Sequence, residues 1–215
     1  MSYPIHIVDV FTERALVGNQ LAVVLDAGDI PPEVMERVAR EMNFSETTFV
    51  MAPSQPGHAP RVRIFTPGTE LPFAGHPTVG TAWVMATQGL VPGGSLEFML
   101  EEGVGPVPVR GEDGANGLTF WMTHPPLTFG EVITDRGRIA AGIGLDEGDL
   151  EPDVPLQVAS TGNEFLYVAL KDAPAVDAAM SDQWAGAASS TSASNTGPTR
   201  TSRRESRSAA RSCRW

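Results

Sequence analysis

The stretch that decides the fold is Thr66-Pro-Gly-Thr-Glu-Leu-Pro-Phe-Ala-Gly-His-Pro-Thr-Val-Gly80. Its first half is rich in proline and glycine, which excludes a long regular element over residues 66–73. A helix is predicted from about Pro77 to Gln88, and Gly89 follows as a stop signal. The apolar face expected from helical spacing consists of Val79, Ala82, Trp83 and Ala86. The stretch therefore predicts a loop that runs directly into the N-terminus of a helix.

The start of this helix is a candidate anion-binding site. The first turn of a helix leaves backbone N–H groups unpaired, and the helix dipole adds partial positive charge there. Gly75 allows a ligand to approach the backbone, and Pro77 suits the first helical position. His76 and Thr78 add polar side chains, so a carboxylate or phosphate is the expected ligand. The alternative is an ordinary helix start with His76 as a polar N-terminal residue.

A second candidate segment is Asn43-Phe-Ser-Glu-Thr-Thr-Phe49, which connects a predicted helix to a predicted strand. Glu46 lies there between aromatic residues. A carboxylate in a partly apolar pocket can exchange protons near neutral pH and serve as a general acid or base. The alternative is that Glu46 is an exposed residue at the edge of a strand, because glutamate is seldom buried.

Short apolar runs around these segments predict many strands and few helices. In the first of the strands, Ile5 and Ile7 are expected to face the core, with Val8 as a further candidate. Such an alternation predicts an α+β fold in which a strand-rich sheet wraps around a helix. The predicted strands cover residues 4–11, 21–25, 47–51, 61–65, 95–101, 106–110, 117–122 and 164–170, and further helices cover residues 31–42 and 135–143.

The composition argues against several classes of protein. The 215 residues carry a net charge of −11, which argues against a general nucleic-acid binder. No apolar run reaches the roughly 18–20 residues that cross a bilayer, and no signal peptide is recognised, so a cytoplasmic location is expected. The single cysteine, Cys213, excludes an intrachain disulfide, and the four histidines lie too far apart to predict a metal site.

The character of the chain changes near its end. Residues 183–215 contain six arginines and one acidic residue, whereas the preceding residues contain nine basic and 25 acidic ones. The Ser/Arg-rich composition without apolar periodicity predicts no fixed structure. The alternatives are a basic tail for RNA or a membrane surface, and the product of a shifted reading frame. With a boundary at Pro125-Pro126, the predicted domains are residues 1–125, a partial second domain over 126–182 and the tail.

Four ordered motifs resemble the PhzF-like phenazine-biosynthesis isomerase family. They are Asp9-Val-Phe-Thr12, Gly18-Asn-Gln-Leu-Ala-Val-Val24, Asn43-Phe-Ser-Glu-Thr-Thr-Phe-Val50 and the segment from Arg63 to Gly80. The resemblance implies a diaminopimelate-epimerase-like fold, in which each of two similar domains wraps a sheet around a central helix. It also implies catalysis without a metal or an organic cofactor.

The resemblance implies roles for individual residues. The family's catalytic glutamate corresponds to Glu46, and its Gly-His pair corresponds to Gly75 and His76, beside Pro77 and Thr78. Ala74 stands where related cysteine-dependent epimerases have a cysteine, so two-thiol racemisation is excluded. The implied function is cofactor-independent isomerisation of a small carboxylated substrate by proton shuttling through Glu46, as in phenazine biosynthesis, by a protein that dimerises as the family often does.

The acidic motif expected in the family's second half is absent after Met180. This departure predicts a truncation or frameshift near residues 182–190 and an incomplete second domain. The alternative function is therefore a non-catalytic small-molecule-binding protein or an inactive truncated paralogue.

Overall fold

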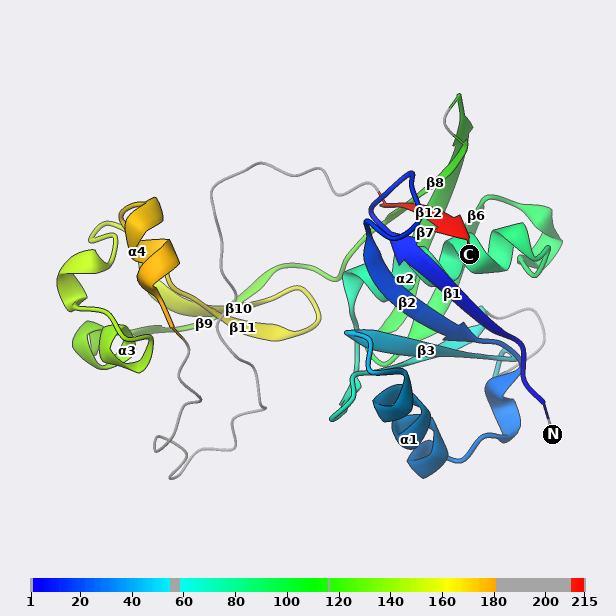
Figure 1. Ribbon diagram of the computed structural model, residues 1–215, viewed down its shortest axis with the longest axis horizontal. Coiled ribbons are helices and arrows are strands. Elements are labelled where there is room, and N and C mark those ends of the chain that lie inside the picture. The colour runs from blue at the N-terminus through cyan, green and yellow to red at the C-terminus, as the bar shows by residue number, and fades with distance from the viewer. Residues whose placement is uncertain (1, 55–58, 116, 181–209, 215) are drawn as a thin grey trace. The chain divides into compact units, whose positions relative to one another are not determined.

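The computed structural model describes residues 2–54, 59–115, 117–180 and 210–214 (Figure 1). The described residues belong to two compact units. The first contains the residues up to Pro125 together with the C-terminal strand, and the second begins at Pro126.

The first unit is built on a nine-stranded mixed sheet that closes on itself. The strand order is β3-β2-β1-β12-β8-β7-β6-β4-β5, and β3 also pairs with β4. The pairs β2–β3 and β4–β6 are parallel and the others are antiparallel. The strands are β1 (Ile5–Val10), β2 (Asn19–Val24), β3 (Glu46–Met51), β4 (Arg61–Phe65), β5 (Glu70–Leu71), β6 (Glu97–Glu102), β7 (Gly105–Gly114), β8 (Gly117–Met122) and β12 (Ala210–Arg214).

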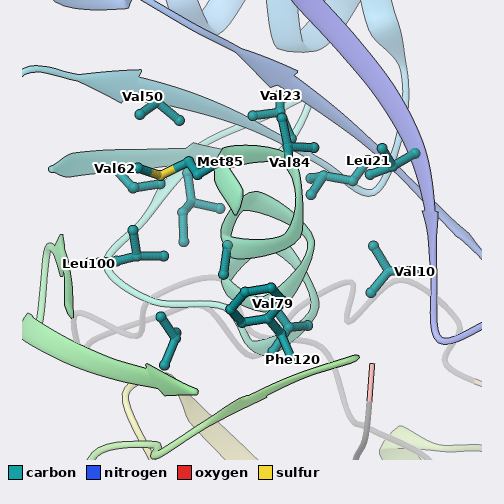
Figure 2. Packing of buried hydrophobic residues seen from close by; sticks show 14 of the residues in the cluster. Val10, Leu21, Val23, Val50, Val62, Val79, Val84, Met85, Leu100 and Phe120 are labelled. Carbon is teal, nitrogen blue, oxygen red and sulfur yellow. The ribbon is translucent and has the colours of Figure 1, made fainter. Parts of the chain in front are cut away.

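Helix α2 (Gly75–Thr87) occupies the centre of this curled sheet, and buried side chains surround it on every side (Figure 2). The buried surface of α2 is wider than the single apolar face expected from the sequence. Val84, Met85 and Thr81 are also buried, and the hydroxyl of Thr81 lies 2.8 Å from that of Thr48 on β3. A helix without charged side chains suits this position because it has no polar face to keep in water.

Helix α1 (Pro32–Met42) packs on the outer face of the sheet. Successive strand residues point to opposite faces, so Val50 contacts the core around α2 whereas Phe49 packs with Met35 and Ala39 of α1. The first unit also contains the short 3-10 helices Ala27–Asp29 and Pro92–Gly94. The α+β class predicted from the sequence is confirmed.

The expected orientation of β1 is wrong for Ile5 and Ile7, whereas the further candidate Val8 does lie in the core. Ile5 and Ile7 are 45% and 37% exposed, whereas Val8 and Val10 are buried against α2. Side chains of a strand alternate between its two faces. Because Val8 and Val10 face the core, Ile5 and Ile7 face outward.

The second unit has a small core beneath a three-stranded sheet of order β11-β10-β9. Ile139, Ile143, Leu150 and Leu156 form this core. Its elements are β9 (Thr128–Ile133), α3 (Arg136–Gly142), a 3-10 helix (Glu147–Asp149), β10 (Leu156–Ser160), β11 (Glu164–Tyr167) and α4 (Ala173–Ala178). Strands β9 and β10 were not predicted. Nearly all residues of β9 are exposed, so its sequence shows no alternation of apolar and polar residues that would indicate a strand.

The prediction that the tail has no fixed structure is wrong for Ala210–Arg214. This segment forms β12 and pairs antiparallel with both β1 and β8. Backbone pairing explains the difference, because a strand between two sheet edges satisfies their N–H and C=O groups whatever its own side chains are. The remaining tail residues, 183–209 and 215, lie outside the described residues.

Close packing between α2 and the sheet generates a stability prediction. A Cβ atom at Gly80 would lie 2.6 Å from Leu21 Cδ2 and 2.8 Å from Val10 Cγ2, both of buried residues. Gly80→Val should therefore lower the free energy of unfolding by about 1–3 kcal/mol through overpacking. The control Gly28→Val, where a Cβ meets nothing within 4 Å, should change it by less than about 0.5 kcal/mol. Urea denaturation measures both, and equal losses would contradict the packing argument.

Candidate active site

Glu46 is held at the first position of β3 by the way in which α1 ends. Asn43 caps that helix in a left-handed conformation (φ 53°), which asparagine tolerates better than most residues, and its N–H donates to Ala39 O. Ser45 Oγ then donates to Asn19 Oδ1 across 3.5 Å, which ties the segment to the start of β2. The Glu46 side chain is 17% exposed, so the carboxylate is largely enclosed.

His76 is the partner of Glu46. Its Nδ1 lies 3.1 Å from Glu46 Oε2, an ion-pair distance, and that oxygen makes no hydrogen bond to a described residue. On the other side of the ring, Nε2 lies 3.4 Å from the carbonyl oxygen of Gln20. The ring therefore lies between two oxygen acceptors, one on the Glu46 side chain and one on the backbone of Gln20. The sequence suggested these two residues separately, and the structure brings them together.

The N-terminus of α2 carries backbone donors beside this pair. Ala74 occupies the N-cap position and supplies no side-chain cap. Thr78 N–H donates to Ala74 O, and Pro77 has no N–H. The N–H groups of Gly75 and His76 precede the first intrahelical hydrogen bond, so they are the donors of this turn that a ligand can use. The backbone part of the predicted anion-binding site therefore consists of two N–H groups, those of Gly75 and His76.

Thr78 is placed differently from the other candidates. Its side chain is completely buried, and its hydroxyl lies 2.8 Å from Ala74 O and 2.7 Å from Glu102 Oε1. The hydroxyl thus has protein partners on two sides. A role for Thr78 in substrate binding stays a prediction, and its observed contacts hold the first turn of the helix.

Glu102 is the residue that the sequence arguments missed. It ends β6, is 6% exposed, and leaves Oε2 without a hydrogen-bond partner among the described residues. Burial raises its pKa to about 7, and a hydrogen bond that Thr78 can donate to the ionised carboxylate opposes that rise. One signal was available, because strand alternation puts Glu102 on the same face as buried Leu100.

The loop after β1 adds an aromatic ring to the site. Phe11 has a left-handed backbone (φ 64°), is 48% exposed, and its ring centroid lies 6.3 Å from that of His76. The loop is anchored by Asp9, a buried residue whose Oδ2 accepts the Leu16 N–H at 2.8 Å. The first motif of the sequence therefore also lies beside Glu46 and His76.

Metal ligation and membrane crossing find no support in the described part of the chain. There, no three His, Cys, Asp or Glu side chains gather closely enough to hold a metal ion. The helices within the described ranges are all too short or too polar to cross a bilayer.

Comparison with known proteins places this geometry in a family. The family model for the phenazine biosynthesis-like protein (PhzC-PhzF) matches residues 8–212. The trans-2,3-dihydro-3-hydroxyanthranilate isomerase of Pseudomonas aeruginosa is 35% identical over 176 residues, which cover 82% of this chain and 60% of that protein. The chain spans 45–60% of the length of three curated relatives that it matches.

Solved structures agree with this assignment. A protein from Pseudomonas aeruginosa described as a predicted epimerase has a TM-score of 0.73 at 32% identity, over 83% of this chain and 62% of that chain. A probable proline racemase from Agrobacterium radiobacter shares the fold alone, with a TM-score of 0.52 at 16% identity over 77% of this chain and 52% of that chain. The diaminopimelate-epimerase-like fold and the resemblance found in the motifs are confirmed. The chain belongs to the phenazine biosynthesis-like, or PhzF-like, isomerase family.

Proposed function

We propose that this chain carries the proton-transfer residues of a cofactor-independent isomerase for a small carboxylated substrate. The observation that supports the proposal is the 3.1 Å contact between Glu46 and His76 at the N-terminus of α2. An enclosed carboxylate, an imidazole and free backbone donors in one place suit the removal of a proton from carbon beside a bound anion.

In this proposal Glu46 is both base and acid. Its carboxylate accepts a proton from an activated carbon, and the electron pair of the broken C–H bond moves into the adjacent π system. The carboxyl proton of Glu46 exchanges with solvent, and Glu46 then returns a proton to a different carbon, which consumes the shifted electron pair. Product and substrate have the same atoms and the same oxidation state, so the reaction needs no co-reactant. A shuttle of this kind contributes roughly 10²–10⁴-fold in rate.

The start of α2 holds the charge of the substrate in this proposal. The N–H groups of Gly75 and His76 donate to its carboxylate, and the helix dipole favours the negative charge. The imidazole of His76 orients a polar group beside Glu46. Pro77 and Thr78 complete the turn that presents these donors.

The substrate class follows from the relatives. Three of them are named trans-2,3-dihydro-3-hydroxyanthranilate isomerase, a name whose substrate is a cyclic amino acid. We infer a cyclic or amino-acid-like carboxylate for this chain as well. A cytoplasmic homodimer that binds neither membrane nor nucleic acid completes the proposal.

One observation favours a second candidate. Residues 181–215 do not contain the acidic motif that the family resemblance leads one to expect in the second half. A non-catalytic small-molecule-binding protein, or an inactive paralogue that keeps the first domain's cradle, would have this property.

Hydrogen exchange tests the role of Glu46. The chain is incubated in D2O with trans-2,3-dihydro-3-hydroxyanthranilate, and NMR follows deuterium at the ring carbons. Glu46→Gln should slow exchange by roughly 10²–10⁴-fold, because the amide cannot accept the proton. The control Glu41→Gln changes an exposed glutamate on α1 and should leave exchange unchanged. Equal exchange in wild type and Glu46→Gln would refute the role.

Calorimetry tests the cradle and separates the two candidates. The stable analogue 3-hydroxyanthranilate should bind about tenfold more tightly than its primary amide, because hydrogen bonds to a charged group contribute more than neutral ones. Binding with exchange supports the isomerase, and binding without exchange supports the non-catalytic protein. Equal affinities for acid and amide would show that the start of α2 does not hold the carboxylate.

A further inference from the structure

A buried carboxyl group lies directly behind the first turn of α2 and has no part in the proposed proton shuttle. Glu102 reaches this position from the end of β6, and Oε1 lies 2.7 Å from Thr78 Oγ1. A backbone hydrogen bond also connects the two segments here. The Val104 N–H, just after β6, donates to the carbonyl oxygen of Pro72, just before α2. The carboxyl group therefore lies between a tight hairpin and the turn that carries Gly75 and His76.

Two oxygen atoms lie within hydrogen-bond distance of the single hydroxyl group of Thr78. Thr78 Oγ1 lies within hydrogen-bond distance of both Ala74 O and Glu102 Oε1, but a hydroxyl has one proton to donate. The Ala74 carbonyl can only accept. Both contacts are therefore complete when Thr78 donates to Ala74 and a protonated Glu102 donates to Thr78. An ionised Glu102 would compete for that single proton and leave a charged Oε2 buried without a partner.

Among the side chains that the structure describes, no charged group forms an ion pair that would offset ionisation of Glu102. The only titratable side chain of α2 is His76, whose imidazole faces Glu46, and β8 has no charged residue. Among the described residues, none forms an ion pair with Glu102. The charged residues of the neighbouring β4, β6 and β7 are Arg61, Arg63, Glu97, Glu101, Arg110, Glu112 and Asp113, of which none is fully buried.

We propose that Glu102 is a positioning residue, which holds the first turn of α2 through Thr78 as a neutral acid and couples anion binding at that turn to its own protonation. The functional part of this inference rests on the proposed anion cradle at Gly75 and His76. In its neutral form Glu102 donates to Thr78 and leaves the cradle without a competing charge. When ionised, it places a negative charge behind donors that would otherwise hold the carboxylate.

The direction of the pH dependence follows. The pKa of Glu102 is raised from 4.5 to about 7 in the folded protein. The folded state therefore binds more protons than the unfolded state between these values, and the free energy of unfolding falls as the pH rises from about 5 to 8. A bound carboxylate repels the ionised form, so anion binding takes up a proton and weakens as the pH rises through about 7.

The test compares wild type with Glu102→Gln, whose amide donates to Thr78 and cannot ionise. At pH 6 both should bind 3-hydroxyanthranilate nearly equally, and at pH 8 the variant should bind about fivefold more tightly than wild type, as expected if the bound anion raises the pKa of Glu102 by about one unit. The control Glu101→Gln changes the neighbouring, partly exposed glutamate and should follow wild type at both pH values. The coupling would be overturned if the affinities of wild type and Glu102→Gln changed by the same factor between pH 6 and pH 8.

A second measurement uses the wild-type protein alone, so it depends neither on a ligand nor on whether a variant folds. Infrared spectroscopy of wild type labelled with ¹³C at glutamate carboxyls should show a protonated carboxylic acid at pH 6 that disappears by pH 8. A failure to bind any anion would overturn the coupling together with the proposed cradle, and the infrared band would still decide whether Glu102 is neutral. An ionised Glu102 at pH 6 would overturn the positioning role itself.

Discussion

The enclosure of α2 is the constraint on which the rest of the first unit depends. Residues 75–87 contain no charged side chain that could face water, and apolar groups project from the helix in all directions. One flat sheet can cover only one side of such a helix. The strands therefore curl until β3 meets β4, and the largest core cluster contains residues from α2 and six or more strands around it.

Enclosure also determines where polar chemistry can occur. Inside the ring, a hydroxyl needs a protein partner, as the pair Thr48–Thr81 illustrates. The N-terminus of α2 lies at the edge of the surrounding sheet. Here the backbone donors and His76 of α2 meet Glu46 from β3 and Glu102 from β6. The same helix thus fixes the core with its body and the candidate site with its first turn.

Much of the first unit could be predicted because its signals are local. Strand alternation and helix stops placed β4 and β8 over the observed ranges, and the motifs identified Glu46 and His76. The contact between those two residues needed the three-dimensional structure, since 30 residues separate them. Strand β12 could not be predicted, because its pairing depends on two sheet edges and not on its own residues. The burial of Glu102 was readable from alternation, but its contact with Thr78 was not.

The central position of α2 has a consequence for protein synthesis. The strands β6, β7 and β8 that cover it end at Met122, roughly 35 residues after the helix, and a ribosome adds about 5–20 residues per second. For some seconds the growing chain therefore contains a finished apolar helix without half of its cover. During that interval the apolar surface of the helix is open to other chains, which favours association before folding is complete.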